Sequence, residues 1–313
     1  MTGVPASAPT PDPAPALDPG DRPAPGYEVL GHLARTGWLD VYDAWSEDRA
    51  CRCVLKTVRP DRRDEAPLRG RLLREGRWLC AFTHPHLVRG YDVIRTPDAL
   101  VVLETLTGET LAHLLHRLRR RPAATDVALL GVQLCSAIHY LHGRGLLHLD
   151  LKPSNVVVER GHAKVLDLSV ARPPGPAPPG LGTPAHLSPE QARGGELSAA
   201  ADVWGIGGTL YETAAGEPPF GRWTATGPDA VAGAGAGVGP SAGPGGRAGA
   251  AGGASARGTD TPYPDGPAPP LSARRRLPRA LADAVDACLS PDPRRRPTVP
   301  ELAAALGAVA HRP

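Results

Sequence analysis

The apolar residues of this chain first follow a strand pattern and then a helical one. Residues 27–45 are typical of two strands joined by a turn, and residues 51–60 and 100–103 of further strands rich in β-branched and aliphatic side chains. Leucines at near-helical spacing predict one helix at residues 67–82, among these strands. We therefore expect the N-terminal part to form a sheet with one helix.

From about residue 107 the pattern becomes helical. Residues 125–143 carry apolar side chains at three- to four-residue steps, which predicts a long helix with a buried stripe. Further elements are predicted as helices at 197–220, 277–289 and 300–310, and as a strand that begins at residue 163. No run reaches the roughly 18 unbroken apolar residues of a membrane span, so we expect none.

Two segments follow neither pattern. Residues 1–26 are mostly Pro, Ala, Asp and Gly, and residues 221–270 are rich in Gly, Ala and Pro. The Gly and Pro excess of the chain, 37 residues of each among 313, is concentrated there. Because such segments lack the large apolar side chains that offset ordering entropy, both are expected to be disordered.

Charge and cysteine content exclude some classes of protein. The net charge of +3 argues against broad nucleic-acid binding. Five Cys in a chain of this length do not suit a disulfide framework, and their odd number suits a reducing compartment. The N-terminus lacks the basic and apolar regions of a signal peptide, so we expect a cytoplasmic protein.

Candidate chemistry centres on H-L-D-L-K-P-S-N, residues 148–155, which places Asp150, Lys152 and Asn155 at fixed offsets. A carboxylate can accept the proton of an attacking hydroxyl, an ammonium can stabilise a migrating phosphate, and an amide oxygen can bind a metal ion. The same residues could also simply cap a turn. The interpretation therefore depends on the charged residues elsewhere in the chain.

Lys56 lies in a predicted apolar strand, where an unpaired cation is costly. Glu75, on the helix that follows, is the expected partner, although it could instead pair with neighbouring arginines along an exposed helix. Asp167 follows another apolar strand, and a metal ion would provide the partner that it needs there.

Taken together, these motifs resemble the eukaryotic-like (Hanks-type) serine/threonine protein kinase family, whose catalytic loop is H-R-D-L-x-x-x-N. The composition is similar to that of a high-GC, actinobacterial-type bacterium. The resemblance implies an α+β, bilobal protein-kinase-like fold. The small antiparallel-sheet lobe with one helix would span residues 27–106, and the large, mainly helical lobe would span 107–220 and 271–313.

The resemblance implies roles for the polar residues. Asp150 would be the catalytic base, with Lys152 beside it, and Thr183 would hydrogen-bond both Asp150 and Lys152. Lys56, held by Glu75, would contact the phosphates of ATP. The Mg²⁺ (or Mn²⁺) ligands would be Asn155 and Asp167. The adenine-binding positions would be Val41, Val54, Leu103, Glu104, Leu106 and Val157, with Glu109 near the ribose. The structural pairs would be Glu190 with Arg296, and Asp202 with backbone N–H groups of the catalytic loop.

Some positions depart from the family pattern. The three glycines of the phosphate-covering loop are replaced by Ala34, Thr36 and Leu39, and Ser169 replaces the glycine of D-F-G. Because glycine lets backbone N–H groups approach phosphate, we expect a stiffer loop or weaker ATP binding. Leu149 replaces an arginine that pairs with a phosphorylated activation loop, and residues 170–182 contain no Ser, Thr or Tyr. Activity independent of activation-loop phosphorylation is therefore predicted.

The function implied is transfer of the γ-phosphoryl group of Mg-ATP to Ser or Thr of protein substrates, with self-association for autophosphorylation as a possibility and no nucleic-acid partner. A pseudokinase that binds partners is the alternative, favoured by the missing glycines and Ser169. A small-molecule phosphotransferase is disfavoured by Lys152, Thr183 and the Ser-Pro-Glu segment at residues 188–190.

Overall fold

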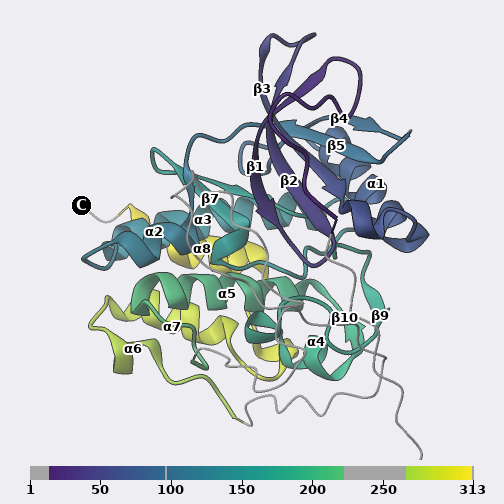
Figure 1. The fold of residues 1–313 in the computed structure, drawn as a ribbon. Helices are drawn as coiled ribbons and strands as arrows, with labels where there is room; N and C mark the ends of the chain where they lie inside the picture. The colour runs from purple at the N-terminus through teal and green to yellow at the C-terminus, as the bar shows by residue number, and fades with distance from the viewer. Residues whose placement is uncertain (1–13, 96, 222–265, 312–313) are drawn as a thin grey trace, which may run out of the picture.

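Five strands near the N-terminus form one antiparallel sheet in the computed structural model, which describes residues 14–95, 97–221 and 266–311. The sheet order is β1-β2-β3-β5-β4. The bounds are β1 Tyr27–Arg35, β2 Leu39–Ser46, β3 Cys51–Val58, β4 Gly90–Ile94 and β5 Leu100–Glu104. Figure 1 shows this small lobe above a larger, mainly helical lobe, so the predicted α+β bilobal fold is confirmed.

One helix of the small lobe, α1 (Ala66–Ala81), packs against β4 and β5. Its buried residues Leu72 and Leu79 face the core. Gly76 allows an unusually close approach, because a Cβ at this position would lie 2.5 Å from the Val101 side chain. The neighbouring Glu75 is thereby held against the sheet, where its side chain is fully buried.

The large lobe is organised around α3 (Ala124–His142), which packs between α5 (Ala199–Ala215) and α8 (Val299–Ala310). Among the described residues, α3 alone is long and apolar enough to cross a membrane, but it lies in the core of this lobe. The other helices are α2 (Leu111–Arg117), α4 (Pro189–Arg193), α6 (Leu271–Arg274) and α7 (Arg279–Cys288).

Short strands and 3₁₀ turns carry the segments between these helices. The strands are β6 (Glu109–Thr110), β7 (Val156–Glu159) and β8 (His162–Val165), which form one small sheet, and β9 (Gly175–Ala177) and β10 (Gly195–Leu197), which form another. The 3₁₀ turns are η1 (Pro60–Arg62), η2 (Pro153–Asn155), η3 (Pro184–His186) and η4 (Pro293–Arg295). The motif at residues 148–155 lies in the connection between α3 and β7.

The predicted disorder of residues 1–26 is wrong for the described part, residues 14–26. The Leu17 N–H donates to the Tyr42 hydroxyl at 3.0 Å, and the Gly20 N–H donates to the Val29 carbonyl at 2.9 Å. Ala24 is buried in the apolar cluster around Tyr42. Backbone hydrogen bonds and a few small apolar side chains are thus sufficient to hold this segment on the sheet.

The predicted disordered insertion at residues 221–270 falls mostly outside the described residues, at 222–265. Its last part, residues 266–270, is described and leads into α6. Ala268 packs against the core of the large lobe there, so the predicted insertion extends a few residues too far.

The predicted Glu190–Arg296 ion pair is present and joins α4 to the turn before α8. The two guanidinium N–H groups donate to the two carboxylate oxygens at 2.6 and 2.9 Å. Arg296 also donates to the Ala200 carbonyl at 2.8 Å, and its guanidinium lies 4.9 Å from the Trp204 ring centroid. Because the Arg296 side chain has no exposed surface, this bidentate pair ties three segments together inside the lobe.

Replacing Arg296 by methionine is expected to lower the free energy of unfolding by about 3–5 kcal/mol, because the largely buried Glu190 carboxylate loses its counter-charge. The free energy is measured by urea denaturation. Arg295→Met is the matched control, because the Arg295 side chain is 81% exposed. Its effect should stay below about 0.5 kcal/mol, and equal effects of the two variants would contradict a structural role for the ion pair.

Candidate active site

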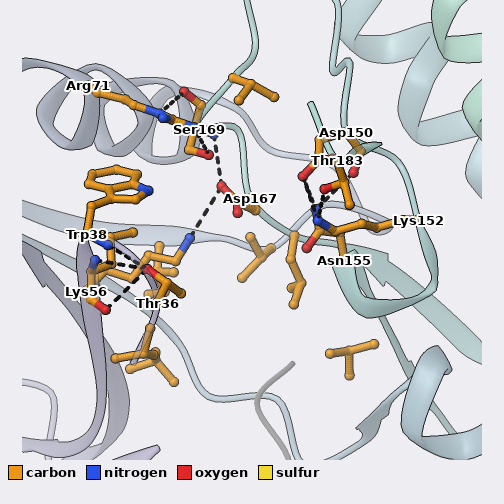
Figure 2. A pocket seen from close by; sticks show the side chains of 18 of the residues that line it. Thr36, Trp38, Lys56, Arg71, Asp150, Lys152, Asn155, Asp167, Ser169 and Thr183 are labelled. Carbon is orange, nitrogen blue, oxygen red and sulfur yellow. Dashed lines mark hydrogen bonds and ion pairs between the residues drawn. The ribbon is translucent and has the colours of Figure 1, made fainter. Parts of the chain in front are cut away.

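A cleft lies between the small-lobe sheet and the catalytic loop, residues 148–155 (Figure 2). All six positions predicted to bind adenine line it: Val41, Val54, Leu103, Glu104, Leu106 and Val157. Val88, shortly before β4, and Leu166, just after β8, line it too and were not predicted, because apolar periodicity does not show which residues beside a short strand border a cavity. Glu109 is not among the lining residues, since its carboxylate pairs with Arg117 at 2.5 Å.

The connection between the lobes leaves a backbone donor free. The N–H of Glu104 is occupied by the Arg89 carbonyl at 3.0 Å, and its side chain forms an ion pair with Lys164 at 2.5 Å. Within the described residues, the N–H of Leu106 makes no hydrogen bond. A flat heterocycle with an acceptor edge could bond there, between the apolar walls of the cleft.

Lys56 and Glu75 form the predicted ion pair, with the Lys56 Nζ 2.7 Å from Glu75 Oε1. The same Nζ lies 3.8 Å from Asp167 Oδ1 (Figure 2). Burial lowers the pKa of Lys56, but the carboxylates of Asp167 and Glu75 outweigh this effect and raise it above its usual value. The ammonium is therefore charged and is directed by two carboxylates from different lobes.

Asp202, on α5, holds the catalytic loop from beneath. Its carboxylate accepts the N–H groups of His148 at 2.9 Å and of Leu149 at 2.7 Å, as predicted. His148 Nδ1 accepts the Asp150 N–H at 3.2 Å, so its Nε2 carries the proton and donates to the Leu166 carbonyl at 3.0 Å. The His148 ring thus connects the loop to the segment that leads to Asp167.

Asp150 has one occupied and one unoccupied oxygen. Oδ2 lies 3.0 Å from the Lys152 Nζ and accepts the Asn155 amide at 3.1 Å. Oδ1 is buried and has no hydrogen-bond partner among the described residues. Because an unpaired buried carboxylate oxygen is costly, the site is suited to a hydroxyl donor from outside the chain.

Thr183 lies beside the Asp150 carboxylate, as predicted, but makes only one of its two predicted hydrogen bonds among the described residues. Its hydroxyl accepts a hydrogen bond from the Lys152 ammonium (Figure 2). In the described part of the chain it makes no bond to Asp150, contrary to prediction. The reason is geometric, since Lys152 lies between the two groups and contacts both.

A backbone hydrogen bond joins the segments that carry the two predicted metal ligands, Asn155 and Asp167. The Leu166 N–H donates to the Asn155 carbonyl at 2.8 Å, and Asp167 follows directly. Asn155 uses its amide N–H groups on Asp150, and its amide oxygen has no hydrogen bond among the described residues. Burial raises the pKa of Asp167, but Lys56 and the N–H of Ser169 outweigh this and lower it.

An ionised carboxylate beside an amide oxygen fits a Mg²⁺ ion that takes its other ligands from water and phosphate. The described residues contain no group of three His, Cys, Asp or Glu side chains that could form a closed metal cage. The donor set present here therefore suits a metal that is bound together with a phosphate substrate.

His186, in η3, is a site residue that the sequence analysis missed. Burial and, to a smaller extent, the nearby Lys152 lower the pKa of its imidazole to about 4. The ring is therefore neutral at pH 7 and adds no second positive charge beside Asp150. A single His in a loop gives no sequence signal for such a position.

The turn between β1 and β2 is closed by its own hydrogen bonds. The Thr36 hydroxyl accepts the N–H of Leu39 at 2.9 Å, and the Thr36 N–H donates to the Leu39 carbonyl at 2.8 Å. The Trp38 N–H lies 3.3 Å from the same hydroxyl. Because these N–H groups are occupied within the turn, the loop has fewer free backbone donors than a glycine-rich one.

Comparison with known proteins matches this arrangement to one family. The protein kinase domain model matches residues 27–306. The chain is 33% identical over 208 residues to a probable serine/threonine-protein kinase of Streptomyces coelicolor, which covers 62% of this chain and 31% of that protein. It is 34% identical over 215 residues to the DNA damage-responsive serine/threonine-protein kinase RqkA of Deinococcus radiodurans, covering 65% and 32%.

A third relative, the serine/threonine-protein kinase PknB of Mycobacterium leprae, is 32% identical over 206 residues, covering 62% of this chain and 33% of PknB. The chain thus spans about a third of the length of the curated relatives it matches. Because the domain model covers most of the chain, this protein belongs to the protein kinase family, and the relatives to which it is similar are bacterial serine/threonine-protein kinases.

Proposed function

We propose that this protein transfers the γ-phosphoryl group of ATP to serine or threonine hydroxyls of protein substrates. The observation that carries the proposal is Asp150 Oδ1, which is buried and has no partner among the described residues, in a cleft that also holds the paired Lys56 and the ionised Asp167. Phosphoryl transfer to a hydroxyl requires a base that is free to accept the hydroxyl proton and a cation that is held in place.

Residues of both lobes take part in the proposed transfer. Mg-ATP, when bound, supplies the phosphoryl group, and its metal ion neutralises phosphate charge. Lys56, positioned by Glu75, orients the phosphates, while Asn155 and Asp167 hold the metal ion. Asp150 accepts the proton of the substrate hydroxyl at Oδ1. Lys152, shared between Asp150 and Thr183, keeps the carboxylate directed and stabilises charge on the transferring group.

A protein substrate is favoured over a small molecule by the segment beside the base. Thr183 bonds Lys152, and the Ser188 hydroxyl begins α4, whose Glu190 is locked by Arg296. We infer that an extended peptide binds along this anchored segment, which begins beside Asp150 at Thr183. The three relatives are all named serine/threonine-protein kinases, which supports the same substrate class.

Independence from activation-loop phosphorylation is part of the proposal. Leu149 is buried in an apolar cluster with Leu147 and Leu197, against which Val170 and Leu181 pack. The Gln191 amide also donates to the Leu149 and Leu181 carbonyls at 2.7 and 2.8 Å. Apolar packing and an amide bridge thus hold the segment where other kinases use an arginine and a phosphate.

A pseudokinase, which would bind nucleotide or partners without catalysis, is the second candidate. The closed turn at Thr36 favours it, because few backbone donors remain for phosphate. Asp150 and Glu75 each have a buried oxygen with no partner in the part of the chain that the structure describes. These oxygens weigh against a pseudokinase, because a scaffold has no need for buried polar atoms without partners.

Replacing Asp150 by asparagine is expected to reduce phosphoryl transfer by about 10²–10⁴-fold, because the base is lost while the site keeps its shape. Transfer of labelled phosphate from Mg-ATP to a generic basic protein measures the rate, and a thermal shift measures ATP binding, which should persist. Asp283→Asn is the control, since the Asp283 side chain is 66% exposed on α7 and does not line the cleft.

An active wild type whose Asp150→Asn variant transfers phosphate at the same rate would overturn the assignment of the base. A wild type that binds ATP but transfers no label would instead favour the pseudokinase.

Lys56→Met, measured in parallel, should lose phosphoryl transfer because the ATP phosphates are misplaced. Mapping the labelled residues distinguishes serine and threonine acceptors from tyrosine.

Phosphatase treatment is expected to leave the initial rate unchanged and without a lag, because no phosphate is needed to hold the activation segment. Progress curves of treated and untreated enzyme, with mass spectrometry to verify dephosphorylation, make the comparison. A lag that disappears after preincubation with Mg-ATP would show that phosphorylation is required.

The apolar cluster can be tested separately. Leu149→Ala should slow transfer, because the cavity loosens the packing of the activation segment on the catalytic loop. Leu129→Ala is the matched control, since Leu129 is 44% exposed on α3. Equal rates in the two variants would show that the cluster does not hold the segment.

A further inference from the structure

Three side chains without an assigned role meet at one wall of the cleft: Trp38, Arg71 and Ser169 (Figure 2). They come from the β1–β2 turn, from α1 and from the segment after Asp167. Trp38 and Ser169 lie at or beside positions where the sequence departs from the glycine-containing pattern of the family. Their contact shows that the two departures are connected in space.

Arg71 makes the connection. Its Nε donates to the Ser169 carbonyl at 2.7 Å and one of its terminal N–H groups to the Ser169 hydroxyl at 3.1 Å. The guanidinium carbon lies 4.7 Å from the centroid of the Trp38 ring. The planar group thus bonds Ser169 with its edge and stacks on Trp38 with its face, which a lysine ammonium cannot do.

The other two members are themselves held in place. The Trp38 carbonyl accepts the Arg59 N–H at 3.0 Å, and the Trp38 N–H lies 3.3 Å from the Thr36 hydroxyl. Ser169 is buried, and its N–H donates to Asp167 Oδ1 at 2.9 Å. Arg71 therefore bonds the same residue whose N–H orients the Asp167 carboxylate.

Arg71 lies one helical turn before Glu75, the partner of Lys56. Burial lowers the pKa of Arg71, but Asp167 and Glu75 partly offset this. One cation, Arg71, thus links the helix that carries Glu75 to the β1–β2 turn and to the Asp167 segment.

We propose that Trp38, Arg71 and Ser169 form a clamp, in which Arg71 is a positioning residue that holds the β1–β2 turn over the nucleotide phosphates. This inference rests on the proposed function. The clamp takes over the placement of the turn that loop glycines provide elsewhere through backbone contacts with phosphate. It also keeps α1 and Asp167 in register without a phosphorylated activation segment. Ser169 contributes a hydroxyl that glycine would lack.

Hydrogen–deuterium exchange without nucleotide tests the clamp independently of catalysis. In Arg71→Lys, which keeps the charge but loses the fork and the stacking, peptides covering residues 34–41 and 166–172 should exchange about tenfold faster or more. Arg77→Lys is the matched control, because Arg77 is exposed on the same helix and bonds only the Leu73 carbonyl within it. Peptides from α3 and α5 should be unchanged in both variants.

Kinetics test the positioning role. Arg71→Lys and Trp38→Leu should each raise the KM for ATP about tenfold, with a smaller fall in kcat. Because both break the same clamp, the double variant should also show about a tenfold rise, whereas independent effects would multiply to about a hundredfold.

The outcomes separate the two proposals. Exchange in Arg71→Lys that equals Arg77→Lys at both peptides overturns the clamp, as does a multiplicative KM effect in the double variant. A wild type that neither binds Mg-ATP nor transfers label overturns the proposed function, and the exchange measurement still decides whether the clamp exists. Faster exchange confined to the two peptides, with a non-multiplicative KM effect, supports the clamp.

Discussion

The carboxylate of Asp202 is the point on which the catalytic loop depends. It accepts two backbone N–H groups, at His148 and Leu149, and Leu149 is held at a φ of +64°, a conformation that costs a non-glycine residue about 1–2 kcal/mol. Charge-assisted hydrogen bonds in a buried setting can offset that strain. The direction of Asp150, the next residue, follows from this arrangement, so the candidate base is positioned by a helix more than fifty residues further along the chain.

Where the chain departs from the family pattern, its own contacts replace what is missing. Leu149 exchanges an ionic anchor for apolar packing against Val170 and Leu181. Thr36 closes the turn that glycines would leave open, and Arg71 joins that turn to Ser169. Each replacement exchanges a contact that needs a phosphate for one that the folded chain already contains. These contacts are the basis for the proposal that this kinase domain holds its own active arrangement.

Much of the fold and of the site could be predicted because both depend on local patterns and fixed offsets. Apolar periodicity located α1, α3 and α5 to within a few residues, except that α5 ends at Ala215. The ordered segment at residues 14–26 was missed, because its stability comes from docking on the sheet around Tyr42 and not from its own composition. Composition indicates how much apolar surface a segment can bury by itself, but not how much it buries by packing against a neighbouring sheet.

The sequence by itself determined which groups are available: Lys56, Glu75, Asp150, Asn155 and Asp167 in family order, with the Glu190–Arg296 pair. Only the tertiary structure decided which of their atoms are free. Among residues 14–95, 97–221 and 266–311, Asp150 Oδ1 has no partner because Lys152 and Asn155 both contact Oδ2, and Thr183 does not bond Asp150 because Lys152 lies between them. The contact of Arg71 with Ser169 likewise joins residues 98 positions apart. Hydrogen bonds are short and directional, so residue types and spacing cannot specify them until the backbone has brought the segments together.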